Sequence, residues 1–190
     1  MEFRIEERHM RDVAVIVPDY FQDQRGFFLE TFRADKFKAL GLPTEFVQDN
    51  HSGSVKGVVR GLHFQWDPPM GKLMRVTRGT AFVVAVDIRK DSPTLGRWFG
   101  VEVSAENYKE VWAPAGFARG FCAVSDYAEI QYKCTGIYNH QGESGILWND
   151  PEIGIEWPLP TADLLLSEKD RKAQTLAQWR ASPQSDHFRY

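Results

Sequence analysis

This chain has few cysteines, no excess of basic residues and no long apolar run. Only two cysteines, Cys122 and Cys134, occur among its 190 residues, too few for a disulfide framework and not paired as a zinc site requires. We expect both to be reduced, small apolar core residues. The formal net charge of -3 gives no sign of a nucleic-acid or anionic membrane partner. No apolar run is long enough to span a membrane, and the charged residues 1–8 lack a signal-peptide core, so we expect a cytoplasmic protein.

The motifs of several common enzyme classes are also missing. The chain has no Gly-rich phosphate loop and no Gly-x-Ser-x-Gly elbow. The sequence therefore gives no indication of a kinase, a Rossmann enzyme or a hydrolase. Metal-binding jelly rolls use two histidines one residue apart with a glutamate a few residues later. Here His63 is followed by Phe64 and Gln65, and the other histidines are scattered. We therefore expect no metal site.

Short-period alternation of apolar residues dominates the chain. Val13, Val15 and Val17 alternate before Pro18, as in a half-buried strand. Further strands are predicted over 27–31, 72–77, 80–88, 97–103, 110–113, 120–124, 127–134 and 145–148. The Arg78-Gly79 turn predicts that 72–77 and 80–88 form a hairpin with a two-residue connection. Many short strands divided by glycine and proline predict a sandwich, barrel or jelly roll.

Helix signals are few. Residues 33–40, followed by Gly41, predict one short helix. Ser167-Glu-Lys-Asp170 is a capping pattern that predicts the start of another. No repeat or linker divides the chain, so we expect one domain over residues 1–190 with a polar tail from about residue 180. That tail is expected to be mobile or packed on a partner.

The segment 57–65 carries the first candidate for chemistry. As a strand it would place Val59, Gly61, His63 and Gln65 on one face and Val58, Arg60, Leu62 and Phe64 on the other. Read alone, His63 is either a histidine satisfied within the structure or a base that accepts a proton near neutral pH.

Lys72 is a second candidate, because alternation puts it on one strand face with Met74 and Val76. An unpaired buried ammonium is costly. Lys72 is therefore either an edge residue whose charge reaches water or a fixed positive charge that meets a negative charge developing in a reaction.

Tyr132 and Asp170 each allow two interpretations. The alternation of 127–134 turns Tyr132 inward, either as a packing residue or as a proton donor that faces a base across a substrate. Asp170 either completes the helix start or, if its segment folds over the sheet, orients His63 and stabilises its positive charge. The residues alone leave these alternatives open.

These residues lie in blocks that resemble the dTDP-4-dehydrorhamnose 3,5-epimerase family. Matching blocks include Arg60-Gly-Leu-His-Phe-Gln65, Lys72-Leu-Met-Arg-Val76 and Leu166-Ser-Glu-Lys-Asp170. Others cover 23–30, 48–54, 86–89, 92–96, 114–118, 132–133 and 148–151, so the similarity runs over nearly the whole chain. The resemblance implies a mainly β, cupin-like jelly roll with a few short helices. It also implies a homodimer that swaps an N-terminal strand, and neither a metal nor an organic cofactor.

The resemblance further implies a role for each candidate. His63 would be the base, held by Asp170, with Lys72 stabilising an enolate and Tyr132 as the acid on the opposite ring face. The matching substrate-binding positions are Arg25 and Arg60 at the diphosphate, Phe28, Glu30, Gln48 and Asn50 at the nucleotide or its sugar, and Tyr138 along the pocket. Protons on C3 and C5 of such a sugar are acidic because both carbons flank the C4 ketone. Inversion then requires a base, a cation and an acid.

Two positions depart from the family pattern. Arg119 stands where members typically have histidine, and Val83 stands where they have the aspartate thought to pair with it. A buried aspartate without its partner would be unpaired, which explains why both are replaced together. We expect Arg119 to grip a phosphate as a bidentate donor. The departure leaves open which sugar nucleotide is used and whether both carbons are inverted.

The leading prediction is thus an epimerase that inverts C3 and C5 of a dTDP-4-keto-6-deoxyhexose in deoxysugar biosynthesis. One alternative is an epimerase of a single centre, or one that acts on a CDP- or GDP-linked keto sugar. Another is a non-catalytic jelly roll that binds sugar nucleotides. A metal-dependent cupin oxygenase is the last alternative.

Overall fold

The computed structural model describes all 190 residues. Its strands are β1 (Phe3–His9), β2 (Val13–Pro18), β3 (Tyr20–Asp23), β4 (Gly26–Leu29), β5 (Gln48–Val55), β6 (Val59–Gln65), β7 (Lys72–Arg78), β8 (Thr80–Asp87), β9 (Trp98–Ser104), β10 (Glu110–Ala113), β11 (Phe117–Ala123), β12 (Tyr127–Cys134) and β13 (Glu143–Gly145). The helices are α1 (Ala34–Ala39), α2 (Glu168–Arg171) and α3 (Leu176–Ala181), with 3-10 turns at His140–Gly142, Thr161–Asp163 and Pro183–His187. None of these helices has the length and apolar character needed to cross a membrane.

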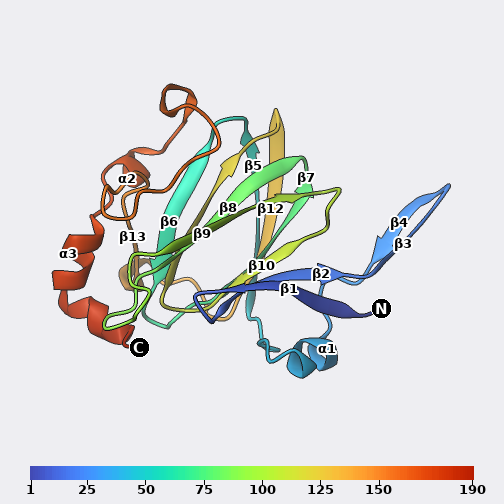
Figure 1. The fold of residues 1–190 in the computed structure, drawn as a ribbon, viewed down its shortest axis with the longest axis horizontal. Helices are drawn as coiled ribbons and strands as arrows, with labels where there is room; N and C mark the ends of the chain where they lie inside the picture. Colours follow the sequence, from blue (N-terminus) through green and yellow to red (C-terminus); the bar gives the residue numbers. More distant parts are fainter.

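Two antiparallel sheets face each other and enclose the main core (Figure 1). The six-stranded sheet has the order β1-β2-β10-β7-β12-β5, and the five-stranded sheet has the order β13-β6-β11-β8-β9. Val76 and Ile130 from the first sheet pack with Val83 and Phe121 from the second in one buried cluster. This arrangement confirms the prediction of a mainly β, cupin-like jelly roll with a few short helices.

The predicted hairpin of 72–77 with 80–88 is wrong. Both strands exist, but β7 pairs with β10 and β12, whereas β8 pairs with β11 and β9 in the other sheet. Between them Gly79 has a φ of +70°, a conformation that glycine adopts without a steric penalty. The connection is therefore a corner between sheets. Alternation along the two strands reports burial inside the sandwich but not which strands pair.

The outer faces of both sheets are covered by segments from the two ends of the chain. Phe37 of α1 packs with Leu73 and Trp112 over the six-stranded sheet, and α1 closely matches the helix predicted at 33–40. On the five-stranded sheet, Trp179 of α3 and Phe188 pack over Phe64.

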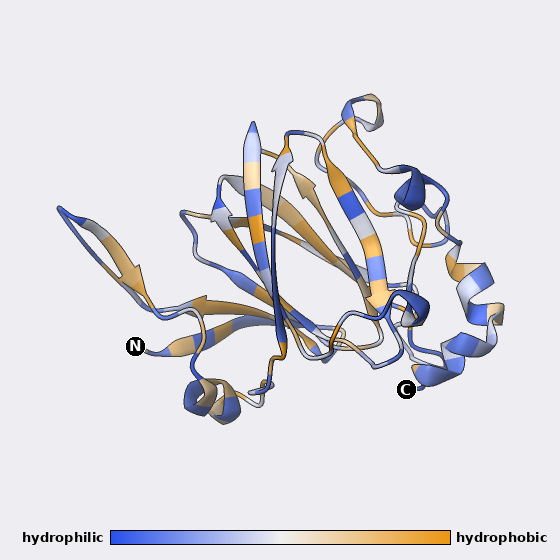
Figure 2. Cartoon of the chain, turned by 180° about the vertical axis from the view of Figure 1, so that it is seen from behind, coloured by the Kyte–Doolittle hydropathy of each residue, from blue (hydrophilic) through white to orange (hydrophobic).

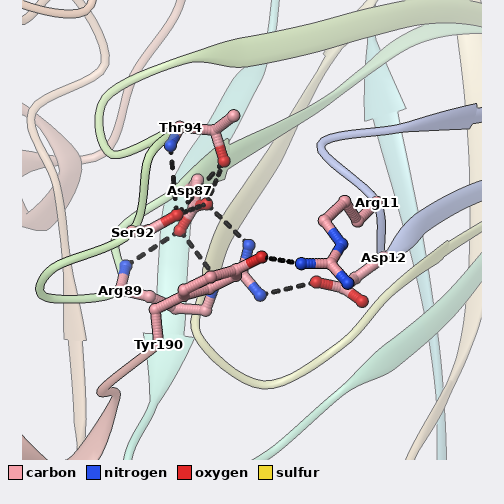
Figure 3. A network of polar contacts seen from close by, with 7 residues as sticks. All are labelled: Arg11, Asp12, Asp87, Arg89, Ser92, Thr94 and Tyr190. Atoms are coloured by element: carbon pink, nitrogen blue, oxygen red, sulfur yellow. Dashed lines mark hydrogen bonds and ion pairs between the residues drawn. The ribbon is translucent and has the colours of Figure 1, made fainter.

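The expectation of a mobile or partner-bound tail is therefore wrong, because the tail packs on its own chain. Figure 3 shows the last residue against this same chain, where the Tyr190 hydroxyl contacts Arg11. Beside it, Arg89 donates to Asp87 at 2.7 Å and to Asp12 at 2.6 Å. The apolar side chains that anchor the tail, Trp179 and Phe188, are spaced too far apart to show a period.

The β3–β4 hairpin projects from the rest of the molecule (Figure 1). It contains the strand predicted at 27–31, paired with a strand that the sequence did not reveal. Its three phenylalanines, Phe21, Phe27 and Phe28, are 71%, 58% and 66% exposed, and Figure 2 shows the apolar character of this arm. An isolated two-stranded hairpin has little stability of its own.

Candidate active site

A cavity of about 500 Å³ opens beside β6, between the two sheets and the α2 segment. Its wall combines residues from β5, β6, β7, β12 and the chain around α2. Eight of the sequence-predicted site residues line it: Gln48, Asn50, Arg60, His63, Lys72, Tyr132, Tyr138 and Asp170. These positions are far apart in the sequence, so the fold alone brings them together.

His63 and Asp170 form a tight pair at one side of the cavity. His63 Nε2 lies 2.6 Å from Asp170 Oδ1, and Asp170 is 4% exposed. Burial raises the pKa of Asp170, but hydrogen bonds and charge from His63 and a hydrogen bond from Ser167 outweigh it, so this pKa lies below its usual value. Asp170 is thus a carboxylate that accepts the Nε2–H proton, which leaves Nδ1 of His63 as the nitrogen able to act as a base.

Asp170 satisfies both interpretations that the sequence left open. Its backbone N–H donates to Ser167 Oγ at 3.1 Å, which caps the start of α2. Its carboxylate reaches His63 and also interacts with the Ser167 hydroxyl. Asp170 therefore completes the helix start through its backbone and contacts the histidine through its side chain.

An irregularity in β6 determines which of its side chains reach the cavity. His63 pairs with Arg119 of β11, but Arg60 pairs with Phe121, so three steps along β6 face two along β11. Simple alternation placed Arg60 and His63 on opposite faces, and this prediction is wrong because such a bulge shifts the pattern by one residue. Gly61, at the bulge, has a φ of +146°, and a Cβ there would lie 2.7 Å from Gly120 Cα. Glycine is thus required at this close approach.

Lys72 and Tyr132 face the same cavity from the six-stranded sheet. Lys72 Nζ lies 4.8 Å from the centroid of the Tyr132 ring. Burial, and then the positive charge of Arg119, lower the pKa of Lys72 to about 8. Burial raises the pKa of Tyr132, although Asn50, Arg60 and Arg119 act in the opposite direction. At neutral pH the site therefore contains an ammonium and a protonated phenol.

Arg119 lies deeper, in an adjoining cavity of about 160 Å³ that His63, Lys72 and Tyr132 also line. It is 3% exposed, and its Nη1 donates to Met70 O at 2.7 Å. We expected Arg119 to grip a phosphate, but the structure does not support this. A buried position beside the three candidate catalytic groups suits contact with the sugar ring rather than with the diphosphate.

Three predicted binding residues do not reach this cavity in a single chain. Arg25 and Phe28 lie on the exposed β3–β4 hairpin, where Arg25 pairs with Asp23 at 2.6 Å. Glu30 lies at the base of the hairpin beside Arg33 and the N-terminal amine.

The cavity also contains a cluster that the sequence did not reveal. Glu143 Oε1 accepts from Tyr138 Oη at 2.8 Å and from Lys169 Nζ at 2.5 Å, so residues from three separate segments meet at the mouth of the cavity. Lys169 stands next to Asp170 in a matched block, which was a usable signal. Glu143 lies in no matched block, and no apolar alternation around it indicated a strand.

Taken together, these groups define a jelly roll whose cavity offers a base, a cation and a phenolic acid. No group of three or more His, Cys, Asp or Glu side chains is arranged to hold a metal ion. Such a set of side chains can remove a proton beside a carbonyl, stabilise the resulting oxyanion and return a proton.

Comparison with known proteins identifies the family. The family model described as dTDP-4-dehydrorhamnose 3,5-epimerase matches residues 7–178, and the chain belongs to this family. A dTDP-4-dehydrorhamnose 3,5-epimerase of Methanothermobacter thermautotrophicus is 51% identical over 93% of this chain and 96% of its own length. A dTDP-4-dehydrorhamnose 3-epimerase of Streptomyces niveus is 41% identical over 87% of this chain and 80% of its own.

A solved structure supports the same relationship. The dTDP-6-deoxy-D-glucose-3,5-epimerase of Legionella pneumophila, in complex with dTDP-4-keto-L-rhamnose, superposes with a TM-score of 0.93 at 42% identity. The similarity covers 100% of this chain and 99% of that protein.

Proposed function

We propose that this protein epimerises C3 and C5 of a dTDP-4-keto-6-deoxyhexose on the route to dTDP-rhamnose or a related deoxysugar. The observation that carries the proposal is the meeting of His63, paired with Asp170, with Lys72 and Tyr132 around one cavity. The family to which the chain belongs supports the choice of substrate.

In the proposed mechanism His63 takes the proton from C3, and the C–H electron pair moves into the ring to form an enolate. The negative charge on the C4 oxygen is stabilised by the Lys72 ammonium. Tyr132 then returns a proton to C3 from the opposite ring face, so the carbon is inverted. Exchange with solvent removes the proton from the imidazolium and restores the phenol. The same cycle at C5 completes the reaction.

In this proposal the polar residues at the rim of the cavity bind the nucleotide. Arg60 meets the diphosphate, while Gln48 and Asn50 contact the nucleoside, and Tyr138 lies along the sugar. The alternative of inversion at one centre rests on the two departures from the family pattern, Arg119, which lines the inner cavity, and Val83, which lies in the core between the sheets.

Deuterium uptake tests the proposal. The dTDP-linked 4-keto-6-deoxyglucose incubated with enzyme in D2O should gain two deuterons, one at C3 and one at C5, by mass spectrometry and NMR. One deuteron would favour a single-centre epimerase, and uptake only with CDP- or GDP-linked sugars would change the substrate. No uptake with any of the three would refute epimerisation.

We also propose a homodimer in which the β3–β4 hairpin completes the cavity of the partner subunit. The hairpin carries Arg25 and Phe28 far from the cavity of its own chain, and it exposes apolar side chains that need cover. A second copy would bury those side chains and use the two residues in binding.

Complementation tests this arrangement. Mixed dimers of His63→Ala and Arg25→Ala subunits, prepared by co-expression with two tags, should have one working site, in which an intact His63 meets the intact hairpin of the other subunit. If each hairpin served its own chain, no site in the mixed dimer would be intact. Mixed dimers no more active than the two parent variants would contradict the proposal, as would a monomeric mass by light scattering.

A further inference from the structure

The inner cavity of about 160 Å³ is lined by positive charge without a balancing negative charge. Arg60, Lys72 and Arg119 line it, and no carboxylate does. An unpaired buried charge is costly, and proteins normally place a counter-charge beside it. Here the chain supplies none within the cavity.

The hydrogen-bonding groups of this cavity are also left without partners. Arg119 uses only Nη1, which donates to Met70 O and Ala113 O at 2.7 and 3.3 Å. Its Nε and Nη2 are buried and have no partner, and neither does the buried hydroxyl of Ser52. Buried guanidinium nitrogens without partners are rare and call for an explanation. The pattern fits a site for an anion that is not part of the resting protein.

We propose that Arg119 is a second electrophilic group of the reaction, which binds the oxyanion formed at C4 of the sugar through Nε and Nη2, together with the Lys72 ammonium. This inference rests on the proposed function. Lys72, His63 and Tyr132 line the same cavity as Arg119. Nε and Nη2 of Arg119 are closed off in the resting protein, so in this proposal the guanidinium turns toward the cavity when the oxyanion forms. A planar guanidinium offers two parallel donors to one anionic group, which an ammonium does not.

Arg119 also acts on Lys72 through its charge. The groups that influence Lys72 are Arg119 and Lys169, which lower its pKa, and Cys134 and Glu143, which raise it. Removing the Arg119 charge should therefore raise the pKa of Lys72 from about 8. A residue that only packed in the core would leave that pKa unchanged.

Arg119→Met tests the inference. We expect kcat for deuterium exchange to fall roughly 100- to 1,000-fold, as when one donor to an oxyanion is removed, with KM changed by less than about threefold. The alkaline limb of the pH profile should move to higher pH. Arg119→Lys, which keeps the charge, should recover part of the rate and return the limb toward that of the unchanged enzyme.

Controls separate this role from a structural one. Arg75→Met removes a cation from the six-stranded sheet, on the strand β7 that also carries Lys72, and should leave both readouts unchanged. Wild-type kinetics in Arg119→Met would overturn the inference. So would a rate loss with an unmoved alkaline limb and no recovery by lysine.

A binding assay keeps the inference testable even if the wild-type enzyme shows no exchange. Nitrate, a small planar anion, should raise the melting temperature of the wild-type protein saturably and that of Arg119→Met much less. Exchange by neither protein, together with this nitrate difference, would count against the proposed substrate but not against the anion site. Equal responses to nitrate would count against the site.

Discussion

Replacing Asp170 by asparagine isolates the charge that supports the proposed base. The carboxylate lies 2.6 Å from His63 Nε2 and is 4% exposed, so the imidazolium formed during proton removal has an anion in direct contact. With charge centres roughly 4 Å apart and an effective dielectric constant of about 20, that attraction is about 4 kcal/mol. Since about 1.4 kcal/mol corresponds to a factor of ten, kcat should fall about 1,000-fold.

The assay is deuterium uptake at C3 and C5 under saturating substrate, with KM measured in parallel. Asparagine retains the shape and can still accept from Nε2, so folding and KM should change little. Glu168→Gln is the matched control, because it removes a neighbouring carboxylate from the same helix start that is exposed and paired only with Lys172. If Asp170→Asn keeps more than a tenth of the wild-type rate, or if both variants lose activity equally, the Asp170 charge does not support the base.

Three further results are expected. Because the Lys72 ammonium is required and its pKa is about 8, kcat should fall tenfold per pH unit above that value; a rate unchanged up to pH 10 would contradict this. Tyr132→Phe should abolish inversion while deuterium still enters C3 with retention, since His63 alone then removes and returns the proton; loss of both would assign Tyr132 another role. Burial raises the pKa of Glu110 to about 8 from 4.5, so its contribution to stability is present below pH 4.5 and is lost as pH rises through 8. Between pH 5 and pH 9 the urea midpoint of Glu110→Gln should therefore rise relative to that of the wild type. A difference between the two midpoints that does not change with pH would contradict a pKa raised by burial.

The strands with a clean alternation of apolar residues could be predicted from the sequence, and the polar ones could not. In β12, Ala128 and Ile130 enter the core as predicted. In β5 the inward positions are Gln48, Asn50 and Ser52, which line the two cavities rather than the core and therefore carry no apolar signal. A strand that lines a binding site is for this reason the hardest to find from periodicity.

For the candidate site, residue types were predictable and their geometry was not. Local patterns indicated a base, an ammonium and a phenol, but the partner of His63 lies 107 residues away in Asp170, beyond any local pattern. The bulge that turns Arg60 toward the same cavity depends on the close approach of Gly61 and Gly120. Such long-range pairings are set by the packing of the two sheets.

The sandwich itself explains why inversion suits this fold. His63 belongs to the five-stranded sheet, whereas Lys72 and Tyr132 belong to the six-stranded sheet. Facing sheets pack about 10 Å apart, a gap that leaves room for one sugar ring where side chains are drawn back into a cavity. In the proposed mechanism a ring held there would meet His63 on one face and Tyr132 on the other without any movement of the backbone. The opposition of base and acid that inversion demands would then follow from placing them on different sheets, and variants of either side chain should change the rate without changing the fold.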